Sequence, residues 1–202
     1  KLKIVTHHWG ANWNKGFEIY QLLDNLLADK NWKELIEFTY IGNLPPNFEF
    51  KNSETVKPLS GLELATKIKE NHIYITASIN EPSGNHHIEA AQCGIPLLYI
   101  DSGGLPEYCN NFGVMFNKET FVNGLSEIME NYDYYQKQMK SYPFNSEIMC
   151  KDYEKLFVSM YNNKDKIIEE RTNNLENFTT SYLSFEISKK IKKLKKIVRQ
   201  YI

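Results

Sequence analysis

Two glutamates, Glu81 and Glu89, stand eight positions apart in the segment EPSGNHHIEAAQCGIP at residues 81–96. Small residues after Glu81 favour a turn, and the residues around Glu89 favour a short helix that ends at Gly94 before Pro96. Because helical side chains lean toward the N-terminus of their helix, Glu89 is expected to point back toward Glu81. Carboxylates accept hydrogen bonds from vicinal hydroxyl groups. The pair therefore favours one small site for a polyhydroxylated ligand.

The turn between these glutamates carries residue types that suit phosphate binding by the backbone. Ser83 or Asn85 is expected to cap the helix, and Gly84 allows a ligand or another backbone to approach closely. The N–H groups at a helix N-terminus, here around His86, attract anions. This combination suits a nucleotide sugar, because carboxylates accept hydrogen bonds from its hydroxyl groups and N–H groups donate to its phosphates.

Two further loops follow expected strands. Lys15 and Gly16 open a helix after the first strand, so that a lysine and a helix N-terminus can meet the same anion. Gly103 and Gly104 permit a tight turn after the strand that ends near Asp101. Taken singly, each has an ordinary structural interpretation, namely a solvated lysine and a common turn.

The histidines allow two interpretations. A metal cluster is one, but adjacent histidines on a helix point about 100 degrees apart and do not readily hold one ion together. Packing or capping by His86 is the other. The residues concerned are His7, His8, His86, His87 and Glu89.

The elements that position these loops alternate between strands and helices. Short apolar runs with few polar residues are typical of parallel strands covered on both faces, and ligands of open parallel sheets lie beyond the carboxyl ends of the strands. We therefore predict an α/β fold with a Rossmann-like parallel sheet flanked by helices. Strands are expected within residues 1–7, 37–42, 55–59, 72–77, 96–101 and 112–116, and helices within residues 15–32, 60–71, 85–94 and 118–161.

Length and composition fit one globular domain with an appendage. The chain has 202 residues, of which 42% are hydrophobic, and its three cysteines form no CxxC pair, which favours neither a disulfide framework nor a zinc knuckle. No apolar run approaches the roughly 20 residues of a membrane span. We expect a cytoplasmic protein with a Rossmann-like nucleotide-sugar-binding domain at residues 1–163 and a basic amphipathic helical extension at residues 164–202.

The charge of the chain is unevenly distributed. Seven cations and no acid lie in residues 187–202, so the other residues carry a net charge of about −8, which argues against nucleic-acid binding by the body. Apolar residues of this tail recur at helical spacing and leave lysines on the remaining face. An anionic membrane surface, another domain or chain, and plain solvation of the helix end remain open as interpretations. The apolar residues are Ile187, Ile191, Leu194, Val198 and Tyr201.

The ordered set of loops resembles the C-terminal, donor-binding half of GT-B glycosyltransferases of the group 1, family 4 type. The resemblance covers about residues 1–161. It depends on the glutamate pair with its continuation EAAQCGIP, the GGLPE turn at 103–107, the lysine-glycine pair after the first strand, and the terminal region YPFNSEIMCKDYEKLFVSMY at 142–161.

The resemblance implies a retaining transfer without a metal or other cofactor, from a UDP- or GDP-sugar to a glycan or lipid-linked acceptor in polysaccharide biosynthesis. It assigns the donor sugar hydroxyls to Glu81, the ribose to Glu89 and the leaving diphosphate to Lys15. Residues 56–59 would lie near the base. Backbone groups of Gly84, Asn85 and His86 would face the sugar and diphosphate, with Gly16, Gly103 and Gly104 as further donor-binding positions.

Two departures qualify this resemblance. Gly10 stands where the family often has an arginine, and His8 or Asn12 are the candidate substitutes for the lost cation. The acceptor-binding domain that normally precedes this half is absent from the sequence, so the chain is expected to be incomplete for turnover. A non-catalytic nucleotide-sugar-binding or scaffold module is therefore an alternative, and a GT-B epimerase or phosphorylase is another.

Overall fold

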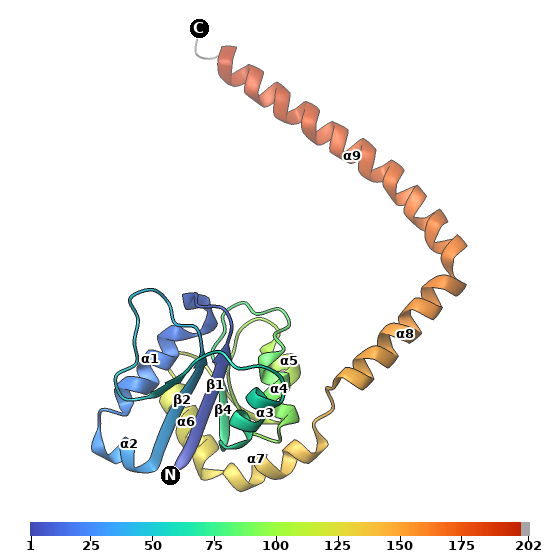
Figure 1. The fold of residues 1–202 in the computed structure, drawn as a ribbon. Coiled ribbons are helices and arrows are strands. Elements are labelled where there is room, and N and C mark those ends of the chain that lie inside the picture. Colours follow the sequence, from blue (N-terminus) through green and yellow to red (C-terminus); the bar gives the residue numbers. More distant parts are fainter. Residues whose placement is uncertain (199–202) are drawn as a thin grey trace. The chain divides into compact units, whose positions relative to one another are not determined.

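Six parallel strands form one sheet in the order β3-β2-β1-β4-β5-β6 (Figure 1). β1 is paired in register with β2 from Leu2 opposite Ile36 onward, and with β4 through Ile4 opposite Ile73. The order reverses direction between β1 and β4, which confirms the predicted Rossmann-like α/β fold. The strands are β1 (Leu2–His8), β2 (Ile36–Gly42), β3 (Glu54–Val56), β4 (Ile73–Thr76), β5 (Leu97–Ile100) and β6 (Gly113–Phe116).

The computed structural model describes residues 1–198, with the side chains of residues 173, 175–181 and 192–198 outside the description. Its helices are α1 (Phe17–Leu26), α2 (Lys30–Leu35), α3 (Gly61–Lys69), α4 (His86–Gln92), α5 (Leu105–Cys109), α6 (Phe121–Glu130), α7 (Tyr132–Gln138), α8 (Ser146–Asn162) and α9 (Lys164–Val198). Two short 3-10 turns, Trp13–Lys15 and Met139–Ser141, precede α1 and follow α7. The single helix expected within residues 15–32 is wrong, because the chain turns after Leu26 and the Asp29 side chain caps α2 by accepting from the N–H groups of Asn31 and Trp32.

Alternating residues of β1 serve the two faces of the sheet. Thr6 and His8 form hydrogen bonds with Tyr20 of α1, whereas His7 forms one with Glu89 of α4. α6 packs closely on the sheet because Gly124 lies against Phe116 of β6. The strands β4 and β5 are buried along their whole length, as their apolar runs predicted. Burial from both sides fixes the loops at the carboxyl ends of β1, β4 and β5.

A buried carboxylate holds the loop between β2 and β3. Asp24 of α1 is 3% exposed and accepts hydrogen bonds from the backbone N–H groups of Lys51 and Asn52 at 2.9 and 2.8 Å. The Ser53 hydroxyl donates a third at 2.6 Å. Hydrogen bonds to a charged group are stronger than those between neutral groups, so this contact anchors the entry to β3 and the segment that follows it.

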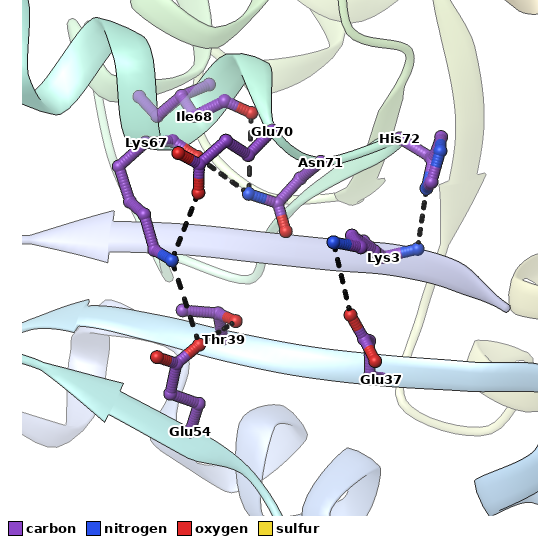
Figure 2. Close-up of polar contacts among 9 residues, drawn as sticks. All are labelled: Lys3, Glu37, Thr39, Glu54, Lys67, Ile68, Glu70, Asn71 and His72. Atoms are coloured by element: carbon purple, nitrogen blue, oxygen red, sulfur yellow. Dashed lines mark hydrogen bonds and ion pairs between the residues drawn. The ribbon is translucent and has the colours of Figure 1, made fainter.

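Charged residues occupy the part of the sheet next to α3 (Figure 2). Lys67 of α3 reaches toward Glu54 of β3, at 3.9 Å, and toward Glu70, at 3.2 Å. Nearby, the Lys3 ammonium pairs with Glu37 at 3.7 Å across β1 and β2. Exposed pairs of this kind contribute little to stability individually. They keep this part of the sheet polar, in contrast to the apolar packing around α1.

The chain divides into two compact units, and the first ends at Asn145. The second unit begins at Ser146 and contains α8 and α9, so the division falls earlier than the predicted domain boundary at residue 163. No residue of α8 is buried. In α9, Ile187 and Ile191 are exposed, whereas the other apolar residues of the predicted tail stripe lie outside the described side chains. None of the described helices combines the length and apolar content that a bilayer span requires.

Candidate functional site

Lys15 and Glu81 meet at the carboxyl edge of the sheet. The Lys15 ammonium lies 2.6 Å from the Glu81 carboxylate, with side chains that are 28% and 17% exposed. Lys15 follows β1 and Glu81 follows β4, so the pair spans the point at which the strand order reverses. Open parallel sheets bind ligands at this point. The contact brings together two residues that the sequence predicted for one site, although they are far apart in the chain.

Glu89 of α4 lies beside the end of β1. Its carboxylate accepts a hydrogen bond from the His7 ring nitrogen Nε2 at 2.9 Å, and this bond lowers the pKa of Glu89. The Glu89 side chain is 52% exposed and that of His7 only 7%. An ionised carboxylate is thus presented to solvent by a buried partner. The sequence indicated His7 only as a doubtful metal ligand, and the strand-ending His7-His8 pair was the one available signal for this contact.

The rings of His8, His86 and His87 form a packed cluster. The His86 ring lies 4.7 Å from the His8 ring, centre to centre, and its Nε2 is 2.8 Å from the Thr76 hydroxyl. Burial is the main reason why the pKa values of His8 and His86 lie well below the ordinary value. The lowered pKa disfavours the protonated form of His8, which makes His8 a poor candidate for the cation missing at Gly10. Among the described residues, no group of three or more His, Cys, Asp or Glu side chains is arranged to hold a metal ion.

The glycines of the predicted site bring loops close to one another. A Cβ at Gly103, which has a φ of +60°, would lie 2.4 Å from the Glu81 carbonyl oxygen. The Gly104 N–H donates to that same oxygen at 2.8 Å. Gly84 lies against the His86 ring. A Cβ at Gly10 would lie 3.4 Å from the Lys15 side chain. The turn after β5 thus supports the backbone of Glu81.

The capping prediction for α4 is wrong. Asn85 stands at the N-cap, but its side chain makes no capping hydrogen bond. Its φ of −82° and ψ of −27° are helical, whereas a capping side chain requires extended backbone at that residue. The Ser83 hydroxyl lies 3.3 Å from the Tyr108 hydroxyl of α5 instead.

A separate groove of about 590 Å³ lies between β3 and α3. Its lining includes Val56 and Leu59, the segment predicted to lie near a base. Its lining carries one lysine, Lys67, and three glutamates, so the net charge of the groove is unfavourable for phosphate. The remaining lining residues are Leu62, Glu63 and Thr66.

His87 of α4 makes the first unit sensitive to acid. Its side chain is fully buried, and within the described part of the chain neither ring nitrogen has a hydrogen-bond partner. Burial lowers the pKa of His87 to about 4 from an ordinary value of 6.5. Between these values the unfolded chain takes up a proton that the folded chain excludes, so stability falls as the pH decreases.

We expect the replacement His87→Phe, which removes both nitrogens, to reduce this acid sensitivity. Between pH 7.5 and pH 5, the buried neutral His87 should cost the wild type about 2 kcal/mol of unfolding free energy, or about 5 °C in melting temperature. The variant should not show this loss. Thermal melts at the two pH values measure the difference. His87→Leu serves as a second variant in case Phe does not fit beside Tyr108, whose ring centre is 5.4 Å away. Equal acid losses in wild type and both variants would contradict the assignment.

Comparison with known proteins finds one family model that matches part of the chain. Residues 49–144 match the family model of the group 1 glycosyl transferases. The match contains Glu81, Glu89, Gly103 and Gly104 but ends short of half of the chain. A search of curated proteins finds no significant match.

Solved structures with a similar fold are GT-B glycosyltransferases. A pneumococcal O-GlcNAc transferase in complex with UDP and GlcNAc is 13% identical, with a TM-score of 0.61, over 79% of this chain and 36% of its own. Sucrose-phosphate synthase from Thermosynechococcus elongatus is 16% identical, with a TM-score of 0.58, over 80% and 46%. The catalytic domain of starch synthase IV from Arabidopsis thaliana, bound to ADP and acarbose, is 16% identical, with a TM-score of 0.57, over 78% and 38%. This chain therefore spans less than half of each of these structures.

Proposed function

We propose that this chain is the donor-binding domain of a retaining glycosyltransferase of the hexosyltransferase type. It would take a sugar from a UDP- or GDP-sugar and transfer it to a glycan or lipid-linked acceptor. The observation that carries the proposal is the Lys15–Glu81 ion pair at the strand-order switch point, with Glu89 of α4 hydrogen-bonded to His7 at the end of β1. The match to the group 1 glycosyl transferases supports sugar transfer as the reaction at this edge of the sheet.

The ion pair suggests how the site receives a donor. Without ligand, the Lys15 charge is balanced by Glu81. A diphosphate offers Lys15 a stronger anion, and the released Glu81 carboxylate can then accept hydrogen bonds from sugar hydroxyl groups. During transfer, the Lys15 charge stabilises the negative charge that develops on the leaving diphosphate. One lysine would thus couple phosphate binding to sugar binding.

Glu89 and the turn before α4 would hold the rest of the donor. The ionised Glu89 carboxylate is exposed enough to accept from the vicinal hydroxyl groups of a ribose. Backbone groups of Gly84, Asn85 and His86 would face the sugar and diphosphate, and residues 56–59 would lie near the base. No metal is needed in this scheme, because Lys15 supplies the positive charge.

Acceptor binding would require a further domain or partner, because this chain corresponds to less than half of the related structures. We place the protein in the cytoplasm, with the basic extension at 187–202 as a contact for an anionic membrane surface or another chain. A role in polysaccharide biosynthesis is part of this proposal. WaaG, another protein of similar fold, is a glycosyltransferase involved in lipopolysaccharide biosynthesis.

One observation favours a non-catalytic sugar-nucleotide-binding module as a second candidate. Gly10 lies against Lys15, so the position at which related enzymes often carry an arginine adds no charge to the site. Burial lowers the pKa of His8 well below its ordinary value, which disfavours a positive charge there as well. Donor binding without turnover, in the presence of an acceptor-binding domain, would favour this alternative.

The proposal predicts that UDP, GDP or their sugars raise the melting temperature of the chain. Glu89→Ala is expected to weaken this binding about 10-fold, because it removes a charged hydrogen-bond acceptor for the ribose. Thermal melts with a nucleotide panel and calorimetric titration measure both effects. Glu130→Ala, at the exposed end of α6, is the matched control and should bind like wild type. Failure of every nucleotide to shift the wild-type melting temperature would refute the donor role.

A further inference from the structure

We propose that His7 is a positioning residue that holds Glu89 in the orientation required for the donor. This inference rests on the proposed donor role of Glu89. The residues involved are Tyr74 of β4, His7 at the end of β1 and Glu89 of α4, which form a continuous chain of hydrogen bonds from the core to the surface.

Tyr74 selects the tautomer of the His7 ring. The Tyr74 hydroxyl accepts a hydrogen bond from the His7 backbone N–H at 3.2 Å and lies 3.1 Å from the ring nitrogen Nδ1. A phenol has one proton, and the ring nitrogen is closer to the hydroxyl than the His7 carbonyl oxygen, at 3.4 Å. Tyr74 is fully buried, and burial raises its pKa, so the hydroxyl keeps that proton. Nδ1 is therefore the acceptor.

A neutral imidazole that accepts at Nδ1 carries its proton at Nε2. Nε2 is the nitrogen that lies 2.9 Å from the Glu89 carboxylate, so His7 donates to Glu89. The His86 ring stands edge-on to the His7 ring, with centres 6.3 Å apart and an angle of 87° between the planes. Tyr74 thus determines the direction of the donated hydrogen bond, and the His86 ring packs beside the His7 ring.

Glu89 needs such a partner because its own side chain is half exposed. A free glutamate side chain samples several rotamers, and binding a ligand would require it to give up that freedom. Only Oε2 is engaged by His7. The second oxygen is left to face a ligand hydroxyl, and its place is set before the ligand arrives. The same second-layer arrangement, a buried donor that orients an exposed ligand-binding group, is common at sites that must be rigid.

The tautomer can be observed directly in the full chain. Long-range ¹⁵N–¹H correlation spectra distinguish a protonated from an unprotonated ring nitrogen. We expect His7 to be protonated at Nε2 and unprotonated at Nδ1 near pH 7, and Tyr74→Phe to weaken this preference. A wild-type ring protonated at Nδ1 alone would overturn the proposal.

Binding measurements then test the functional consequence. His7→Leu is expected to weaken binding of UDP or GDP, whichever the wild type binds better, by about 3- to 10-fold. His7→Gln, whose amide nitrogen can replace Nε2 as the donor, should stay within about 2-fold of wild type. In a Glu89→Ala background, His7→Leu should have no further effect, because a residue that acts through Glu89 has nothing left to position.

The outcomes separate this inference from the proposed function. If wild type binds UDP or GDP and His7→Leu binds equally well, the positioning role is overturned and the donor role stands. If His7→Leu lowers the melting temperature but weakens binding equally with and without Glu89, His7 is only structural. If wild type binds no nucleoside diphosphate, the donor role fails and the positioning role fails with it.

Discussion

Lys15→Ala is expected to weaken binding of a nucleoside diphosphate about 100-fold, which corresponds to about 2.8 kcal/mol. Two effects act in the same direction. The variant loses a charged donor to the diphosphate, and it leaves the Glu81 carboxylate, now 2.6 Å from the Lys15 ammonium, without its partner. An unpaired carboxylate repels the incoming phosphate. The effect on the bare nucleoside should be small, because a nucleoside brings no phosphate to this pair.

Calorimetric titration with UDP and uridine, or with GDP and guanosine, measures the two affinities separately. Lys15→Arg keeps the charge and should recover most of the diphosphate affinity. Lys151→Ala is the matched control, because Lys151 forms an exposed pair with Glu147 in the second unit. A parallel loss of nucleoside and diphosphate affinity in Lys15→Ala would assign Lys15 to the fold and not to phosphate.

The fold was predictable because burial leaves a strong pattern in the sequence. Residues 73–76 and 97–100 are buried along both strands, and their apolar runs marked them as central parallel strands. Parallel strands then place the loops that follow them at one edge of the sheet. Topology therefore predicted that the loops carrying Lys15 and Glu81 lie at one edge, whereas the family resemblance assigned both residues to one donor site.

Contacts that depend on side-chain direction were not predictable. His7 and Glu89 are 82 positions apart, and no spacing rule indicates that one ring nitrogen faces that carboxylate. Asn85 has the residue type of a helix cap, but its helical backbone directs the side chain away from the role. Nor did the sequence indicate that the first compact unit ends before α8, none of whose residues is buried.

Gly16→Ala is expected to destabilise the first unit by about 3 kcal/mol, because two penalties coincide. Gly16 has a φ of +99°, which favours glycine, and an added Cβ would lie 2.6 Å from the Ala77 Cβ and 2.8 Å from the Ala77 carbonyl oxygen. Ala77 follows β4, so the loop that carries Lys15 is packed directly on the strand that leads to Glu81. Relief of the clash must move one of these two loops, and diphosphate affinity should fall together with stability.

Gly94→Ala separates the two penalties. Gly94 has a φ of +82°, but no atom lies within 4 Å of a Cβ built there, so only the backbone cost of about 1 kcal/mol applies. All three tryptophans of the chain, Trp9, Trp13 and Trp32, belong to the first unit, so urea unfolding followed by tryptophan fluorescence reports on that unit alone. Equal losses of unfolding free energy in the two variants would mean that Ala77 can move away from the added Cβ at little cost. A larger loss in Gly16→Ala, with wild-type nucleotide affinity in Gly94→Ala, would establish that the close approach of these loops builds the site.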